Sequence, residues 1–152
     1  MMYLWHVRKI CVVKFLIPID YKLLFELTGN NPDSLAKQIN YGLTEVVRKI
    51  NLHFASGIPL KKIFPVIVVH AGALNAITTN KYYQEHHKLD NPNIKLINEL
   101  VKPGAKFIAC VQAMAFLNIK AEDLLPLVKI SLTAQTVLSS YQLKGYVLYR
   151  DY

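Results

Sequence analysis

The sequence contains only two cysteines among its 152 residues, and this scarcity limits the chemistry that it can carry. Cys11 and Cys110 lie far apart in segments of different character, so we do not expect a disulfide scaffold, although one disulfide between them remains an alternative. The sequence has no Cys-x-x-Cys pair and no cluster with zinc-site spacing. His86 and His87 are adjacent, so they would not share a helix face, and we expect them to be solvated. We therefore predict no metal and no resident cofactor.

The motifs of several large enzyme classes are also missing. No Gly-x-Gly-x-x-Gly follows the first predicted strand, and no Walker lysine loop, Gly-x-Ser-x-Gly elbow or His-Glu-x-x-His helix is present. These motifs supply phosphate cradles, serine nucleophiles and zinc ligands. Their absence disfavours nucleotide hydrolysis and serine hydrolysis.

Charged residues are scarce as well, at 18% of the chain, whereas apolar residues make up 53%. Typical globular chains have about 25% and roughly 45–50%. This surplus of apolar side chains indicates surface buried between subunits, so we expect a homo-oligomer. The formal net charge is +8, but the lysines stand singly or in pairs, without an RNP-like, zinc-finger or basic-helix motif. We predict a solvated basic surface and no nucleic-acid partner, with an anionic small ligand as an alternative.

Residues 1–19 form an atypical amino-terminal extension. The basic pair Arg8-Lys9 precedes an apolar run, as in a signal peptide, but Lys14 interrupts the run, Pro18 ends it and no cleavage site follows. The run is too short to span a membrane, which takes about 20 apolar residues. The extension is either a degraded export signal or an arm used in assembly. We expect a cytoplasmic protein, with a periplasmic location as the alternative if the extension is an export signal.

Residues 20–152 form one domain in which strand and helix patterns alternate. Five strands separated by helices imply parallel pairing through right-handed crossovers. The predicted fold is an α/β three-layer sandwich with a five-stranded, mainly parallel sheet. The predicted strands cover residues 21–27, 63–69, 107–110, 128–130 and 146–149, and the main predicted helices cover residues 32–57, 94–100, 111–117 and 133–144.

Two Asn-Pro pairs are predicted to begin helices. Asn31 is expected to cap the first helix, with Pro32 at its first position and an end near Gly57, because apolar residues repeat at helical spacing between them. The pair at residues 91–92 is expected to open the second helix in the same way. The segment 81–83, with two tyrosines, is interpreted as a solvated loop, with a lid or a subunit contact as the alternatives.

Two residues whose side chains can take part in catalysis end predicted strands. The carboxyl ends of parallel strands face one rim of the sheet, where α/β proteins bind ligands, so a cleft containing His70 and Cys110 is expected. Cys110 also opens a predicted helix, whose free N–H groups and dipole would stabilise a thiolate. The alternative is that Cys110 packs as a small hydrophobic side chain.

Five short motifs occur along the chain: Asn31-Pro32-Asp33, Val68-Val69-His70-Ala71-Gly72-Ala73-Leu74, Asp90-Asn91-Pro92-Asn93, Cys110-Val111-Gln112-Ala113 and Gly145-Tyr146. Their order and spacing resemble those of the DsrE/DsrF-like proteins, over about residues 21–149. This resemblance implies a parallel α/β fold of the sulfur-relay type, assembled as trimers or hexamers. It also implies that the cysteine matching Cys110 accepts sulfane sulfur as a persulfide and hands it to a partner protein.

These observations predict a sulfur-relay protein, a sulfur carrier or sulfurtransferase, in which Cys110 carries the sulfur between donor and acceptor proteins. His70, Gln112, Gly72 and Asn30 are predicted to support the site or bind the ligand. For His70 the alternative is a capping or core histidine, and for Gln112 a helix-surface amide. The alternative function is a non-catalytic, oligomeric small-ligand-binding or interaction module in which Cys110 is merely packed. A third hypothesis, nucleic-acid binding, rests on the net charge alone.

Overall fold

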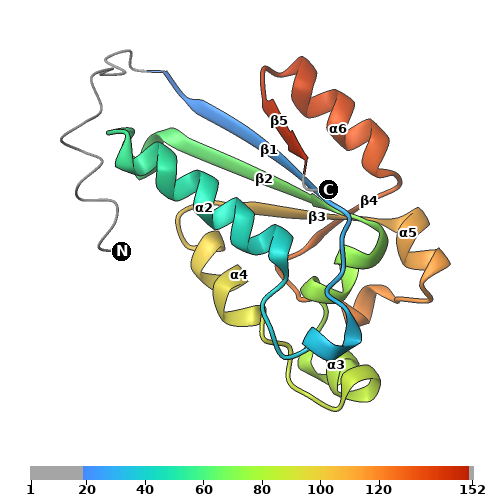
Figure 1. Ribbon diagram of the computed structural model, residues 1–152. Helices are drawn as coiled ribbons and strands as arrows, with labels where there is room; N and C mark the ends of the chain where they lie inside the picture. The colour runs from blue at the N-terminus through green and yellow to red at the C-terminus, as the bar shows by residue number, and fades with distance from the viewer. Residues whose placement is uncertain (1–18, 151–152) are drawn as a thin grey trace.

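All five strands of the sheet run parallel in the computed structural model, which describes residues 19–150 (Figure 1). Their order across the sheet is β4-β3-β2-β1-β5. The predicted fold class and five-stranded sheet are confirmed. The predicted extension lies outside the described residues, except for Ile19. The strands are β1 (Tyr21–Leu27), β2 (Ile63–Val69), β3 (Lys106–Cys110), β4 (Lys129–Ser131) and β5 (Val147–Arg150).

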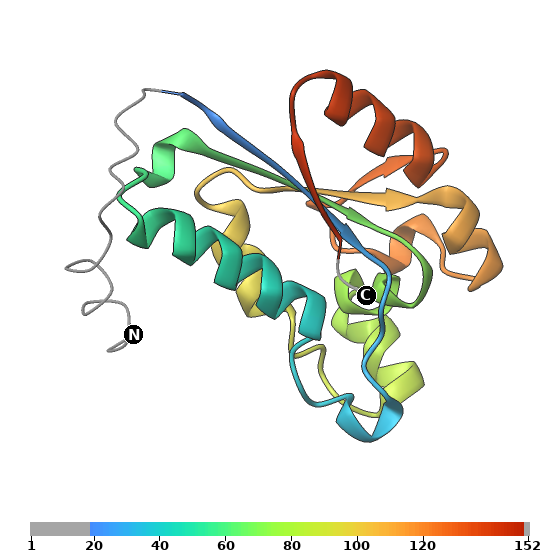
Figure 2. The ribbon, with the colours of Figure 1, turned by 45° about the horizontal axis from the view of Figure 1, so that its top comes forward.

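Helices cover both faces of the sheet (Figures 1 and 2). α2 (Tyr41–Ala55) and α4 (Ile94–Val101) lie on one face, and α6 (Ala134–Leu143) lies on the other. Two further α-helices, α3 (Asn80–His87) and α5 (Val111–Phe116), lie at the end of the sheet where the strands finish. Short 3₁₀ helices complete the connections: η1 (Asp33–Leu35), η2 (Leu60–Lys62), η3 (Ala71–Ile77) and η4 (Ala121–Asp123).

The strand side chains divide between two apolar cores because neighbours along a strand point to opposite faces. On the β1 strand, Phe25 packs on the α2 side with Leu43, whereas Leu24 packs on the α6 side with Leu138. Strands covered on both faces read as continuous apolar runs in the sequence. This is why β1 and β2 have the bounds that the sequence predicts.

The first predicted helix start is wrong. α2 begins at Tyr41 and is capped by Asn40, whose Oδ1 accepts the N–H of Gly42 at 2.9 Å. Asn31 instead closes the preceding loop, because its Nδ2 donates to the carbonyls of residues 38 and 39 and its Oδ1 accepts the N–H of Tyr41. Pro32 leads into η1 rather than a long helix. The predicted end near Gly57 agrees with the last helical residue, Ala55.

The segment interpreted as a solvated loop is a helix, α3. Thr79 caps it by accepting the N–H of Tyr82, and both Tyr82 and Tyr83 are buried. The hydroxyl of Tyr83 donates to the carbonyl of Ala36, and this bond ties α3 to the loop before α2. Burial raises the pKa of both phenols above the usual value. The tyrosines therefore hold α3 against the domain.

A buried group of asparagines joins the loops at the carboxyl edge of the sheet. Asn91 donates twice to carbonyls in the segment 76–78, and its Oδ1 accepts from both the main chain and the side chain of Asn93. The Oδ1 of Asn93 accepts the N–H of Asn40 at 2.7 Å, and Asn40 donates to the carbonyl of Gly29. The network connects the end of β1 to the starts of α2 and α4. The predicted cap of α4 is wrong, because Asn93 rather than Asn91 stands at the cap position and its side chain forms no cap hydrogen bond.

We expect Asn91→Ala to lower the free energy of unfolding by at least about 2 kcal/mol, because it leaves several buried polar groups without partners. Urea unfolding followed by circular dichroism measures the change. Asn98, exposed on α4, offers the matched control, and Asn98→Ala should change stability by less than about 0.5 kcal/mol. Equal small effects at both positions would contradict a structural role for the network.

Candidate functional site

Four polar or ionisable side chains lie along the carboxyl edge of the sheet, one on each of four consecutive strands or strand ends. Cys110 ends β3, His70 follows β2, Glu26 belongs to β1 and Arg150 ends β5. Cys110 belongs to the apolar core beneath α6, and strand alternation places Glu26 and His70 on that same face. We call these four residues the edge cluster.

Glu26 is the centre of the edge cluster. Its side chain is only 10% exposed, and both carboxylate oxygens have partners. Oε1 lies 3.0 Å from Nε2 of His70, and Oε2 lies 2.7 Å from Nε of Arg150. A buried carboxylate is costly unless it is paired, and these two contacts supply the pairing. Glu26 thereby joins β1 to β5 and to the end of β2.

His70 lies between Glu26 and Cys110 in the order of the strands. The last register pair of β2 and β3 joins Val69 to Ala109, so His70 just beyond β2 and Cys110 at the end of β3 are the next residues of two adjacent chain segments. Such strands are about 4.8 Å apart. The main chain of His70 is extended, and its N–H donates to the carbonyl of Leu27 at 3.0 Å. This bond fixes the backbone from which the imidazole projects.

Cys110 is a free cysteine at the junction of β3 and α5. It is 5% exposed and packs in the same apolar core as Val68, Ile108 and Ala134. Its side chain forms no cap hydrogen bond with α5, a helix of six residues. The residue that follows the adjacent strand at this level is His70.

The other predicted site residues lie elsewhere. Gln112 is exposed in the first turn of α5, and Asn30 is exposed in the loop after β1. Gly72 lies against that loop, because a Cβ at this glycine would come within 2.9 Å of the Cβ of Asn30. The structure therefore brings Cys110 and His70 to one face of the edge and places Asn30 and Gly72 in a separate loop contact.

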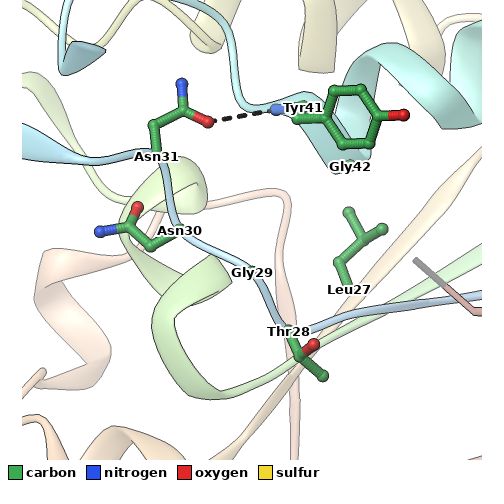
Figure 3. A pocket seen from close by; sticks show the side chains of 7 residues that line it. All are labelled: Leu27, Thr28, Gly29, Asn30, Asn31, Tyr41 and Gly42. Atoms are coloured by element: carbon green, nitrogen blue, oxygen red, sulfur yellow. Dashed lines mark hydrogen bonds between the residues drawn. The ribbon is translucent and has the colours of Figure 1, made fainter. Parts of the chain in front are cut away.

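A hollow of about 130 Å³ lies beside this loop, at the start of α2 (Figure 3). The N–H of Tyr41 donates to Asn31 Oδ1, and the N–H of Gly42 donates to Asn40 Oδ1. The residues that line the hollow in the described chain include no charged side chain. The start of α2 is thus closed by its own asparagines rather than open to an anion.

Sequence reasoning missed Glu26 and Arg150. Glu26 does carry a signal, since it is the one charged residue in the apolar stretch 23–27. A carboxylate in a strand covered on both faces requires a partner. Arg150 has no comparable signal, because its contact depends on β5 pairing with β1.

Within residues 19–150, no three histidine, cysteine or acidic side chains come together as ligands for a metal ion. None of the helices in this range has the length and apolar character needed to cross a membrane.

The fold and the edge cluster define a parallel α/β protein with a single cysteine at the carboxyl end of its third strand. The chain belongs to the DsrE/DsrF-like family, whose model matches residues 22–149. The predicted family resemblance is therefore confirmed.

Two solved structures share the fold. The chain is similar to MTH1491 from Methanobacterium thermoautotrophicum, a protein of unknown function, with a TM-score of 0.61 and 15% identity over 87% of this chain and 100% of that one. It is also similar to the ychN protein from E. coli, with a TM-score of 0.61 and 14% identity over 86% of this chain and 99% of that one. No curated protein matches the chain.

The contact between Gly72 and Asn30 yields a test of the loop packing. We expect Gly72→Ala to lower the free energy of unfolding by about 1–3 kcal/mol, because the added methyl group overpacks a contact with no flexible end to move. Gly29→Ala is the matched control, since a Cβ there meets no atom within 4 Å. Thermal unfolding compares the two variants, and equal midpoints would show that the loop accommodates the methyl group.

Proposed function

We propose that this protein is a sulfur-relay protein that carries sulfane sulfur as a persulfide on Cys110. The observation that carries the proposal is the position of Cys110 beside His70 at the carboxyl edge of the sheet, in a member of the DsrE/DsrF-like family. A thiol needs a base or a stabilising environment to become the attacking thiolate. His70, which directly follows the adjacent strand, is the base that we assign to this step.

In the proposed reaction, the thiolate of Cys110 attacks the terminal sulfur of a donor persulfide, R–S–SH. A bond forms between Sγ and this sulfur as the donor's S–S bond breaks. Sulfur is transferred without net oxidation, giving Cys110–S–SH and R–SH. His70 accepts the proton of the Cys110 thiol and returns a proton to the departing donor thiolate. An acceptor thiol then takes the sulfur in the same way.

Gln112 and the neighbouring surface suit the later steps. The amide of Gln112 is exposed two residues beyond Cys110, where it is available to donate to the persulfide. Leu132 follows the residue opposite Cys110 on β4, and it is 73% exposed. Phe116 on α5 is 89% exposed. These side chains offer apolar surface near the site for a donor or acceptor protein.

The proposed relay also suits a cytoplasmic location. It depends on a reduced thiol, and thiols are kept reduced in the cytoplasm.

The burial of Cys110 favours the second candidate, a binding or interaction module in which the thiol is merely packed. At 5% exposure, the thiol has little direct contact with solvent. A donor therefore reaches it only through local opening of the segments over the cluster. The two candidates differ in whether the native protein gains sulfur.

We expect the wild-type protein to gain the mass of one sulfur atom after incubation with glutathione persulfide, and to lose it after treatment with dithiothreitol. Cys110→Ser should not gain this sulfur, whereas Cys11→Ser, the matched control, should. Mass spectrometry of the intact proteins measures the gain, and the tryptic peptide 107–120 identifies the modified cysteine. If the wild type gains no sulfur, or if Cys110→Ser gains as much, the packed role of Cys110 is favoured.

We also propose that the chain assembles as a homo-oligomer, a trimer or hexamer as the family resemblance implies. Large apolar side chains that remain exposed in the single chain, among them Leu52, Leu143 and Val147, support this assembly. Sedimentation velocity should give a mass three or six times that of one chain. A mass equal to one chain at micromolar concentration would contradict it.

A further inference from the structure

We propose that Glu26 is a positioning residue that controls the reactivity of the Cys110 thiol through His70, with Arg150 balancing the carboxylate charge. The inference rests on the proposed function for the identity of the transferred sulfur, but thiol reactivity can be measured independently. Its structural basis is the continuous order Cys110, His70, Glu26, Arg150 across consecutive strands.

The first step of the argument concerns the imidazole of His70. An ionised carboxylate only accepts hydrogen bonds, so the contact with Oε1 of Glu26 places a hydrogen on Nε2. In the neutral ring, Nδ1 is then the acceptor. Glu26 lies on the β1 side of His70, and the strand on its other side is β3, which ends in Cys110. The contact therefore selects the tautomer in which Nδ1 carries the lone pair, and this is the nitrogen that we assign to accept the thiol proton.

The second step concerns charge. The guanidinium of Arg150 donates from Nε to Oε2 of Glu26 at 2.7 Å. The arginine is 54% exposed, whereas the carboxylate is 10% exposed. Arg150 thus supplies a permanent positive charge beside Glu26. The imidazole of His70 need not be charged to neutralise the carboxylate, and a neutral imidazole is the form that acts as a base.

Other ionisable groups face this part of the molecule. Lys129 on β4 pairs with Ile108 and therefore lies near Cys110, while Tyr141 on α6 and Tyr146 before β5 border the same core. Burial raises the pKa of Tyr146, which keeps its phenol neutral well above neutral pH. In the edge cluster itself, His70 and Cys110 are the groups that exchange a proton in the proposed step, and Glu26 positions the imidazole.

The test is the pH dependence of the alkylation rate of Cys110 by iodoacetamide, followed on the tryptic peptide 107–120 in the full chain. We expect Glu26→Gln to lower this rate at least about tenfold near neutral pH and to displace the profile, because the amide neither selects the same tautomer nor balances Arg150. Glu45→Gln is the matched control, since Glu45 is also ion-paired but lies on α2. Its profile should equal that of the wild type.

The direction of the change in alkylation rate distinguishes a positioning role of Glu26 from a role in stability alone. If Glu26→Gln only loosens the fold, the buried thiol becomes more accessible and alkylation becomes faster. Positioning through His70 predicts slower alkylation, and no further slowing when Glu26→Gln is added to His70→Gln. Faster or unchanged alkylation in Glu26→Gln, or additive effects in the double variant, would overturn the inference.

Sulfur loading measured in parallel distinguishes this inference from the proposed function. If the wild type gains sulfur but the alkylation profile of Glu26→Gln equals that of the wild type, the positioning role is contradicted and the sulfur relay is still supported. Slower, non-additive alkylation without sulfur loading in the wild type supports the positioning role and contradicts the relay.

Discussion

The parallel pairing of all five strands is the constraint on which the rest of the molecule depends. Each connection must return across the sheet, so helices cover both faces and every strand ends at the same edge. Polar groups are excluded from the two cores and gather where the strands stop. Both the buried asparagines and the edge cluster follow from this arrangement. The asparagines form hydrogen bonds with main-chain groups of the loops at that edge, and the edge cluster places ionisable side chains there.

Glu26 is the only charged residue among the buried residues of the described chain. Apolar residues of similar size in place of a buried ion pair are often neutral or stabilising, so the contacts with His70 and Arg150 do not by themselves account for a carboxylate in a core strand. The positioning role that we propose for Glu26 gives this carboxylate a function.

The sequence predicts the sheet better than it predicts the loops and the site. β1 and β2 have their predicted bounds because strands buried on both faces leave long apolar runs. The start of α2 is mispredicted because Asn31 and Pro32 have the composition of a helix cap, although Asn31 instead bonds within its loop. Cys110 and His70 are indicated by their positions at strand ends. The contact of Glu26 with Arg150 spans 124 positions and becomes visible only when β5 lies beside β1.

The position of β5 also has a consequence for the order in which the chain folds. β1, the first of the five strands to leave the ribosome, pairs on one side with β2 and on the other with β5, the last. Until β5 emerges, one edge of β1 lacks its neighbour and Glu26 lacks Arg150. Such distant pairing slows folding and exposes intermediates to association with other chains. Completing the sheet and completing the charge balance of the edge cluster are therefore one event, late in biogenesis.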